Sequence, residues 1–187
     1  MLAGFFVIAG AMGACRTQKS ANTDATPVLS GPPNTTYPMP SLKDYSEMGW
    51  TLSDGRRVKF ADHRGKILVL DFYATWCAPC RESIPRLMLL EQRYGPQGLR
   101  VVGLNVGGPD DHIKVADFSK ELGIQYSLGF PDKALTDLLL FDDQTIPQTF
   151  VFGREGQLVK RFIGYESSTG TQLEELIQSE TARPPSK

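Results

Sequence analysis

The stretch ILVLDFYATWCAPCR at residues 67–81 decides the fold of this chain of 187 residues. Its first part, residues 67–73, is almost continuously apolar, which is typical of a strand that is buried on both faces. A helix is expected to begin near Ala78, because Pro79 suits the first helical turn, where a backbone N–H would have no partner. The stretch therefore predicts a buried strand that leads directly into a helix, with two cysteines at the junction.

The cysteine pair at this junction, Cys77 and Cys80, is placed for thiol chemistry. A cysteine at a helix N-terminus faces unpaired N–H groups and the positive end of the helix dipole, and both favour the nucleophilic thiolate. A zinc half-site is the alternative, but zinc usually takes four ligands, the sequence has no second cysteine pair, and His63 and His112 lack ligand-like spacing. A peroxiredoxin pattern would have Thr or Ser in place of Ala74. We therefore expect no cofactor beyond a redox-active Cys77–Cys80 disulfide.

The segments around this stretch predict an α/β fold with one mixed sheet. Strands and helices alternate early, which implies parallel pairing, and a late strand–turn–strand unit implies antiparallel pairing. The helix after the cysteines should end at Gly95-Pro96 and bend at Pro85 in its interior. Periodicity and turn residues predict the remaining elements: a hairpin at 50–60, strands at 99–106 and 126–129, helices at 110–122 and 133–140, strands at 148–152 and 157–162, and a closing helix at 171–179. The apolar members of the helix at 110–122 are Ile113, Val115, Ala116, Phe118 and Leu122.

Composition gives no sign of nucleic-acid binding, and the N-terminal segment indicates secretion. The formal net charge of −1 gives no electrostatic footprint for nucleic acid, and a hydrophobic content of 41% is enough for a core. Residues 1–14 are uncharged and apolar or small, but too few for a membrane helix of about 20 residues, so they fit a secretory signal. We therefore expect four segments in the chain. They are a signal segment that includes Cys15 at 1–15, a proline-containing disordered linker at 16–40, the folded domain at 41–181 and a polar tail at 182–187.

A family resemblance becomes specific around the cysteines. Residues 70–81, LDFYATWCAPCR, closely resemble the active-site segment of the thioredoxin superfamily. The fuller pattern, over roughly 41–180, is similar to the TlpA/ResA-like thiol-disulfide oxidoreductases of the bacterial envelope, because an Arg64-Gly65-Lys66 turn, Pro85 and Ile146-Pro147 follow in matching order. This resemblance implies a thioredoxin-like three-layer fold, with a mixed central sheet flanked by helices and an added N-terminal β-hairpin.

The resemblance also implies a role for each site residue. Cys77 would be the attacking thiol, Cys80 the resolving thiol, and Asp71 would relay a proton to and from Cys80. Ile146 and Pro147 would form a cis-proline loop beside the cysteines, where the backbone of Ile146 pairs with a substrate chain. The remaining substrate-binding surface would be lined by Trp76, Ala78 and Pro79.

Asp71 can also be judged from its place in the sequence. A carboxylate in an otherwise apolar strand should be desolvated, which raises its pKa and suits a general base near neutral pH. The alternative is an aspartate at a strand end that reaches water. Two positions depart from the family pattern. Gly103 stands where thioredoxin has a lysine that pairs with its aspartate, and Ser83 stands where the envelope branch often has a glutamate.

The expected function is the reduction or exchange of protein disulfides by the Cys77/Cys80 dithiol on the extracytoplasmic side of a bacterial membrane, with apocytochrome cysteines as one narrower substrate. The alternative is a non-catalytic, membrane-tethered thioredoxin-fold module that binds partners through the groove at Ile146-Pro147. The motif MGAC at residues 12–15 resembles a bacterial lipobox, which implies a lipid anchor on Cys15, and an ordinary signal peptide with an incidental cysteine is the alternative. We expect protein disulfides or dithiols as substrates, a membrane electron donor or acceptor as partner, no nucleic acid, and a monomer.

Overall fold

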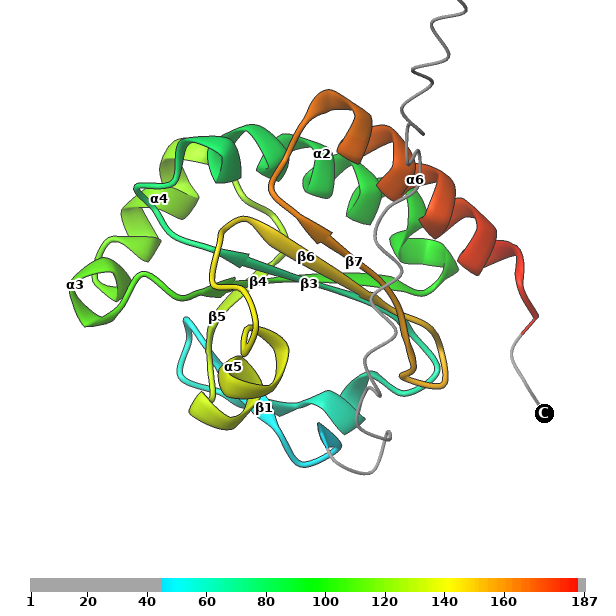
Figure 1. Ribbon diagram of the computed structural model, residues 1–187, viewed down its shortest axis with the longest axis horizontal. Coiled ribbons are helices and arrows are strands. Elements are labelled where there is room, and N and C mark those ends of the chain that lie inside the picture. Colours follow the sequence, from blue (N-terminus) through cyan, green and yellow to red (C-terminus); the bar gives the residue numbers. More distant parts are fainter. Residues whose placement is uncertain (1–44, 185–187) are drawn as a thin grey trace, which may run out of the picture. The chain divides into compact units, whose positions relative to one another are not determined.

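A mixed sheet with helices on both faces organises residues 45–184, which are the residues that the computed structural model describes (Figure 1). The predicted signal segment, Cys15 and the predicted linker lie outside the described residues. In the described part, the sheet has seven strands in the order β2-β1-β5-β4-β3-β6-β7. The strands are β1 (Gly49–Leu52), β2 (Arg57–Lys59), β3 (Ile67–Tyr73), β4 (Leu99–Asn105), β5 (Ser127–Pro131), β6 (Gln148–Phe152) and β7 (Leu158–Ile163).

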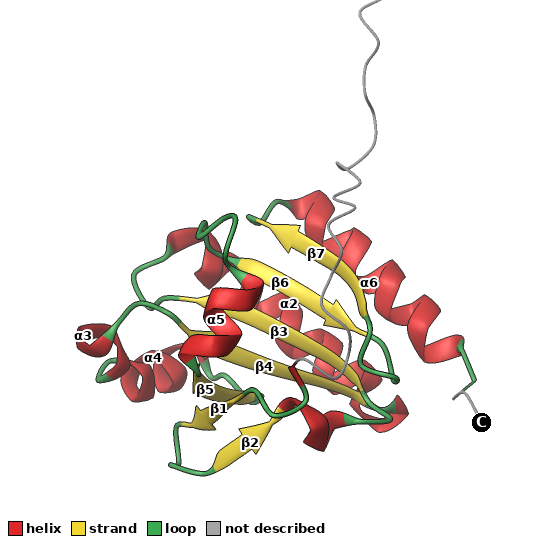
Figure 2. Cartoon of the chain, turned by 60° about the horizontal axis from the view of Figure 1, so that its bottom comes forward, coloured by secondary structure: helices red, strands yellow, loops and turns green. Residues whose placement is uncertain are grey.

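The helices are distributed over the two faces of this sheet (Figures 1 and 2). Helices α2 and α6 pack against each other on one face, together with α4, and α5 covers the other face with the 3₁₀ turn η1. The bounds are η1 (Phe60–His63), α2 (Ala78–Tyr94), η2 (Gly95–Gln97), α3 (Pro109–His112), α4 (Val115–Leu122), α5 (Lys133–Leu139) and α6 (Ser167–Ala182). Among residues 45–184, no helix is long and apolar enough to cross a bilayer.

Strand β3 lies in the interior of the sheet and carries the chain to the cysteines. All seven of its residues are buried, as the apolar run at 67–73 predicts. It pairs in parallel with β4 and antiparallel with β6, whereas the hairpin of β1 and β2 joins the sheet through antiparallel pairing of β1 with β5. The predicted mixed sheet and the predicted N-terminal hairpin are confirmed.

The side chains of β3 alternate between two hydrophobic cores, one on each face of the sheet. Val69 and Tyr73 belong to the core under α2, α4 and α6, and Leu70 and Phe72 belong to the core on the side of α5. Asp71 stands between Val69 and Tyr73 in this alternation. It therefore projects to the α2 face, beneath the helix that begins at the cysteines.

The single helix predicted at 110–122 is wrong, because the structure divides it into α3 and α4. Ile113, an apolar member of the predicted helix, lies in the turn between the two helices and is 80% exposed, and Ala116 is also exposed. The buried positions are Asp111, Val115 and Phe118. These follow each other at the spacing of one helical face. Ile113 lies off this face, which the polar Asp111 shares with Val115 and Phe118.

The hairpin and the closing helix also differ from the prediction at their boundaries. Phe60, expected in the second strand of the hairpin, instead begins η1 and packs edge-on against Tyr45 and Phe152, with ring centroids 4.8 Å from each. The closing helix is longer than 171–179, since it begins at Ser167 and continues to Ala182. The helix after the cysteines ends at Tyr94, immediately before the predicted stop.

Candidate active site

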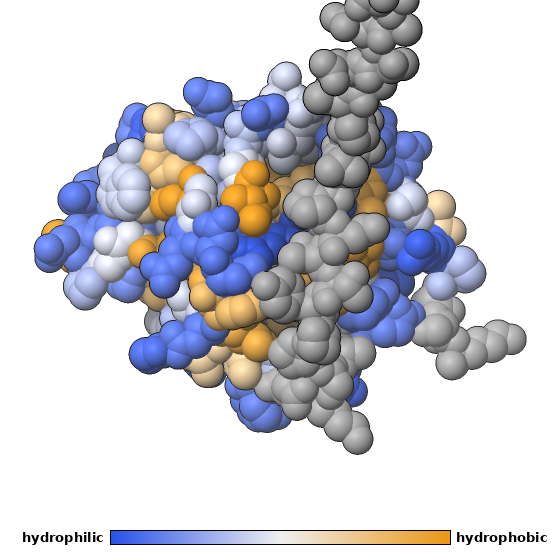
Figure 3. Space-filling model, viewed as in Figure 1, coloured by the Kyte–Doolittle hydropathy of each residue, from blue (hydrophilic) through white to orange (hydrophobic). Residues whose placement is uncertain are grey.

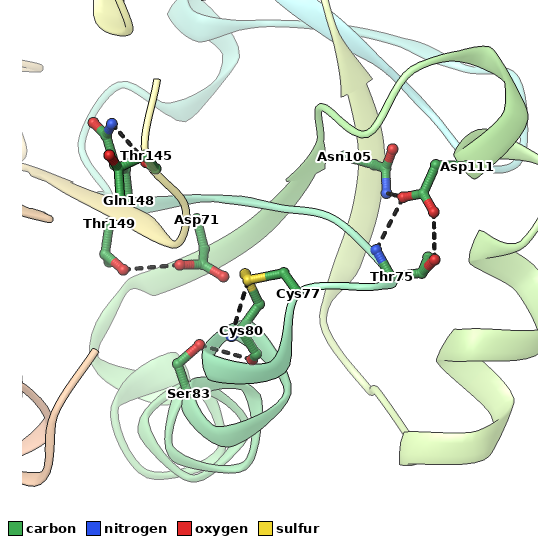
Figure 4. Close-up of a disulfide and its surroundings, with 10 residues drawn as sticks. All are labelled: Asp71, Thr75, Cys77, Cys80, Ser83, Asn105, Asp111, Thr145, Gln148 and Thr149. Atoms are coloured by element: carbon green, nitrogen blue, oxygen red, sulfur yellow. Dashed lines mark hydrogen bonds between the residues drawn. A yellow bond between two sulfur atoms is a disulfide. The ribbon is translucent and has the colours of Figure 1, made fainter. Parts of the chain in front are cut away.

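A disulfide between Cys77 and Cys80 lies where β3 gives way to α2 (Figure 4). Cys77 is the residue immediately before α2, and its Sγ accepts a hydrogen bond from the backbone N–H of Cys80 at 3.2 Å. Pro79 lies in the first helical turn, as predicted. When the disulfide is reduced, this N–H and the positive end of the helix dipole both favour a thiolate on Cys77.

The disulfide is covered by protein but has exposed neighbours. Cys80 is fully buried and Cys77 is 4% exposed, so a partner would reach Cys77 first. Trp76 is 65% exposed, and Ala78 and Pro79 are also exposed. These three predicted binding residues therefore form open surface directly beside Cys77.

The predicted cis-proline loop is present at Ile146-Pro147, whose peptide bond is cis. Strand β6 begins at the next residue, Gln148, which lies opposite Phe72 in the register of β3 and β6. The preceding loop therefore lies beyond Tyr73, at the end of β3 that leads to the cysteines. Ile146 packs partly buried against the core that contains both cysteines. The sheet register thus brings the cis-proline loop to the end of the sheet where the cysteine pair lies.

A polar network that sequence reasoning missed holds this loop. The side-chain amide of Gln148 donates to the backbone oxygens of Asp143 and Thr145, each at 2.8 Å. Arg161 on β7 donates from Nε to Gln148 Oε1 at 2.8 Å and from a terminal nitrogen to both carboxylate oxygens of Asp142 at 2.8 and 2.9 Å. The network ties the segment before the cis-proline to two strands of the sheet. Only the tertiary fold reveals it, because its members have no motif-like spacing.

Exposed apolar side chains lie on three elements around the site. Trp76 precedes Cys77, Phe141 begins the loop that leads to the cis-proline, and Ile163 ends β7 opposite Gln148. On the face of the molecule seen in Figure 3, apolar surface is interrupted by polar and charged side chains. An apolar surface broken by polar groups is suited to transient contact with another protein chain.

Asp71 is fully buried, so the alternative that it reaches water is wrong. Its Oδ1 accepts a hydrogen bond from the Thr149 hydroxyl at 2.8 Å, whereas Oδ2 has no hydrogen-bond partner among the described residues. Figure 4 shows the carboxyl between Thr149 and the disulfide. Burial raises the pKa of Asp71 to about 7, against the lowering effect of the hydrogen bond from Thr149. Asp71 can therefore exchange a proton near neutral pH.

Gly103 lies opposite Asp71 in the register of β3 and β4, as the comparison with thioredoxin predicts. A Cβ atom at Gly103 would lie 2.6 Å from a methyl carbon of Leu128 and 3.2 Å from ring atoms of both Tyr73 and Tyr126. These side chains fill the place where a lysine would stand. A cation therefore cannot be introduced at this position without repacking the core.

A second buried carboxylate, which sequence reasoning also missed, holds the loop before the cysteines. Asp111 accepts hydrogen bonds from the Thr75 backbone N–H at 2.9 Å, from the Thr75 hydroxyl, and from the Asn105 side-chain amide at 2.8 Å (Figure 4). Burial alone would raise the pKa of Asp111, but these hydrogen bonds outweigh it and lower the pKa below its usual value. Asp111 thus fixes the loop two residues before Cys77 as an ionised anchor.

Ser83 stands on α2 where the envelope branch often has a glutamate, and its hydroxyl makes a hydrogen bond within the helix. Ser83 is buried, and its hydroxyl donates to the backbone oxygen of Cys80 at 2.9 Å. Glu82, its neighbour, is exposed. Of the two carboxyls drawn in Figure 4, that of Asp71 lies beside the disulfide, whereas that of Asp111 faces Thr75 and Asn105. Within residues 45–184, no group of three His, Cys, Asp or Glu side chains is arranged to hold a metal ion.

Comparison with known proteins gives a consistent picture. Residues 38–161 match the AhpC/TSA family. The chain is 31% identical over 126 residues to the thiol-disulfide oxidoreductase ResA of Bacillus subtilis, covering 67% of this chain and 65% of that protein. A ResA of Bacillus cereus is 30% identical over 131 residues, covering 68% and 71%. The chain thus spans about two thirds of the length of these curated relatives.

A solved structure supports the same architecture. The crystal structure of a thiol:disulfide interchange protein of Chlorobium tepidum, a thioredoxin family protein, matches with a TM-score of 0.62 at 22% identity. The match covers 73% of this chain and 95% of that one. The predicted thioredoxin-like fold is confirmed.

Proposed function

Because the chain belongs to the AhpC/TSA family and closes a Cys77–Cys80 disulfide at a helix N-terminus, we propose that it is a thiol-disulfide oxidoreductase acting on other proteins. The observation that carries the proposal is the unequal setting of the two sulfurs. Cys77 precedes α2, accepts a backbone N–H and has the exposed Trp76 beside it, whereas Cys80 is fully buried. One sulfur is placed to meet a substrate and the other to act only on its neighbour.

The reaction proceeds in two exchanges. The Cys77 thiolate attacks one sulfur of a substrate disulfide, the substrate S–S bond breaks, and the released substrate thiolate takes up a proton. Cys80 then gives its proton to Asp71 and attacks the Cys77 sulfur, and the second substrate sulfur leaves with the electron pair of the mixed disulfide. The substrate gains two electrons and the protein ends as the Cys77–Cys80 disulfide. In the reverse direction the same steps oxidise a dithiol, and sustained reduction needs a dithiol donor that restores the pair.

The cis-proline loop gives the substrate its orientation in this proposal. A substrate segment in extended conformation would pair its backbone with that of Ile146 and rest on Trp76, Ala78 and Pro79. The hydrogen bonds of Gln148 and Arg161 support this, because they hold the loop in place before any substrate arrives. A pre-ordered loop lowers the entropy lost on binding.

The setting we propose is the extracytoplasmic side of a bacterial membrane, with protein disulfides or dithiols as substrates. Residues 1–14 are apolar or small and precede Cys15, which supports a secretory signal and a lipid anchor. In an oxidising compartment a reductant would need a membrane electron donor to restore its dithiol. The preparation of apocytochrome cysteines is one dedicated use of the same chemistry.

A trapping experiment tests the assigned roles. The reduced Cys80→Ser variant should accumulate a mixed disulfide with a peptide disulfide, because Cys77 can attack but nothing can resolve the product. The matched Cys77→Ser variant should accumulate none, since Cys80 is fully buried. Mass spectrometry of the two products reads the outcome. Trapping through Cys80 and not through Cys77 would refute the assignment.

A further inference from the structure

We propose that Thr149 is the positioning residue of the proton relay: its hydroxyl holds one oxygen of Asp71, so that the other oxygen exchanges the proton with Cys80. This inference rests on the proposed function, in which Asp71 serves Cys80. Thr149 acts through Asp71 and takes no part in the covalent steps.

The contact follows from the register of the sheet. Asp71 on β3 lies directly opposite Thr149 on β6, and the two residues are 0% and 7% exposed. The threonine hydroxyl donates to Oδ1 at 2.8 Å, and Oδ2 has no partner within the described part of the chain. In Figure 4 the carboxyl lies between Thr149 on one side and the disulfide on the other. The carboxyl therefore has one fixed oxygen and one free oxygen, and the free one is on the side of the sulfurs.

The other groups around the carboxyl do not replace this hydroxyl. The titratable groups that face Asp71 are Tyr73 on β3, Tyr126 before β5, and Cys77 and Cys80 at α2. Burial raises the pKa of both tyrosines, so they are neutral wherever Asp71 titrates. Gly103, on the neighbouring strand, supplies no side chain. Among the described residues, Thr149 is thus the side chain that donates a hydrogen bond to the Asp71 carboxyl.

The hydroxyl assigns different tasks to the two oxygens. An oxygen that accepts the threonine hydrogen is less basic, so the proton of the neutral carboxyl resides on Oδ2. When Asp71 is ionised, the same hydrogen bond stabilises its charge. In the resolving step the Cys80 proton moves to Oδ2, the Cys80 sulfur bonds to the Cys77 sulfur, and the substrate sulfur leaves with the electron pair. Thr149 keeps its own proton throughout.

The test replaces the hydroxyl without changing the shape of the side chain. In the oxidised protein, the titration midpoint of the Asp71 carboxyl is followed by NMR of a ¹³C label. Thr149→Val should raise this midpoint by about one pH unit, since a hydrogen bond to the ionised form is lost. Thr149→Ser, which keeps a hydroxyl, should return it to within a few tenths of the parent value. Thr51→Val, at a strand threonine on β1, should leave it unchanged and serves as the matched control.

A second readout connects the contact to the chemistry. The pH midpoint of the resolving step, measured by stopped flow on a preformed mixed disulfide, should rise in Thr149→Val together with the carboxyl midpoint. Equal carboxyl midpoints in Thr149→Val and the parent would overturn the inference, whether or not the protein reduces disulfides. A shifted carboxyl midpoint with an unshifted rate profile would overturn it too, because Asp71 would then not serve Cys80. A parent protein that reduces no disulfide would instead refute the proposed function, and the carboxyl titration would still report on the contact.

Discussion

Replacing Asp71 by asparagine should make the protein more stable at neutral pH and should change how its stability depends on pH. The carboxyl is fully buried, and burial raises its pKa from 3.8 to about 7 in the folded chain. A group with a raised folded pKa holds its proton more tightly when the chain is folded. Its stabilising contribution is fully present below the unfolded pKa near 4 and is lost as the pH rises through the folded pKa near 7. Above that pH the folded chain keeps a buried charge.

The size of the effect follows from the interval between the two pKa values. Each pH unit corresponds to about 1.4 kcal/mol, so the free energy of unfolding of the parent should fall by about 4 kcal/mol between pH 4 and pH 8 because of this one group. Asp71→Asn does not titrate and lacks this fall. The free energy of unfolding of the variant minus that of the parent should therefore rise by about 4 kcal/mol from pH 4 to pH 8. The variant should be the more stable of the two at pH 8.

Urea unfolding of the oxidised proteins at half-unit steps from pH 4 to pH 8 measures this difference directly. Using the difference between variant and parent removes the contribution of every other titrating group that the two share. Asp117→Asn, an exposed aspartate on α4, is the matched control and should follow the parent within about 0.5 kcal/mol. If the Asp71→Asn and parent curves run parallel over the whole range, the raised pKa is refuted, and with it the argument that Asp71 exchanges a proton near neutral pH.

Two further substitutions test the packing around the site. Asp111→Asn turns an acceptor of three hydrogen bonds into a group that also donates, so it should lower the free energy of unfolding, measured in urea at pH 7, by about 3 kcal/mol. The control Asp110→Asn, at an exposed residue, should leave that free energy almost unchanged. Equal effects of the two substitutions would refute the anchoring role of Asp111. Gly103→Ala should lower the free energy of unfolding by about 1 to 3 kcal/mol, since the new Cβ would lie 2.6 Å from a leucine methyl carbon. The control Gly95→Ala, whose Cβ would have its nearest atom at 3.8 Å, should leave the free energy of unfolding nearly unchanged. A Gly103→Ala variant as stable as the parent would refute the tight packing around Gly103.

The parts of the fold that could be predicted from the sequence are those fixed by local chemistry. The apolar run at 67–73 predicts a strand buried on both faces, and Pro79 after Cys77 predicts where the helix begins, because each signal lies within the element it describes. The place of Gly103 opposite Asp71 was also predictable, since two parallel strands after one crossover keep a simple register. Local signals thus determined the strand, the helix and the cysteine pair.

The residues that could not be predicted act across long separations in the chain. Thr149 meets Asp71 over 78 positions, and Thr75 meets Asp111 over 36. Neither contact leaves a spacing or a composition signal, because each depends on which strands become neighbours. The same reason applies to the segment around Ile113. Ile113 is exposed, and the buried position in that segment belongs to Asp111, whose hydrogen-bond partners lie elsewhere in the chain.

The two aspartates of the site differ in depth of burial and in number of hydrogen-bond donors, and these differences decide what each can do. Little of either side chain is exposed, at 2% for Asp111 and 0% for Asp71, but Asp71 lies much deeper in the core, so desolvation acts more strongly against its charge. Three hydrogen bonds are donated to Asp111, which outweigh its burial and keep it ionised, whereas one is donated to Asp71, which leaves burial dominant. A carboxyl saturated with donors holds a loop but cannot exchange a proton near neutral pH. A deeply buried carboxyl with a single donor and one free oxygen can do so, and the depth of burial together with the number of donors separates the anchor of this site from its acid–base group.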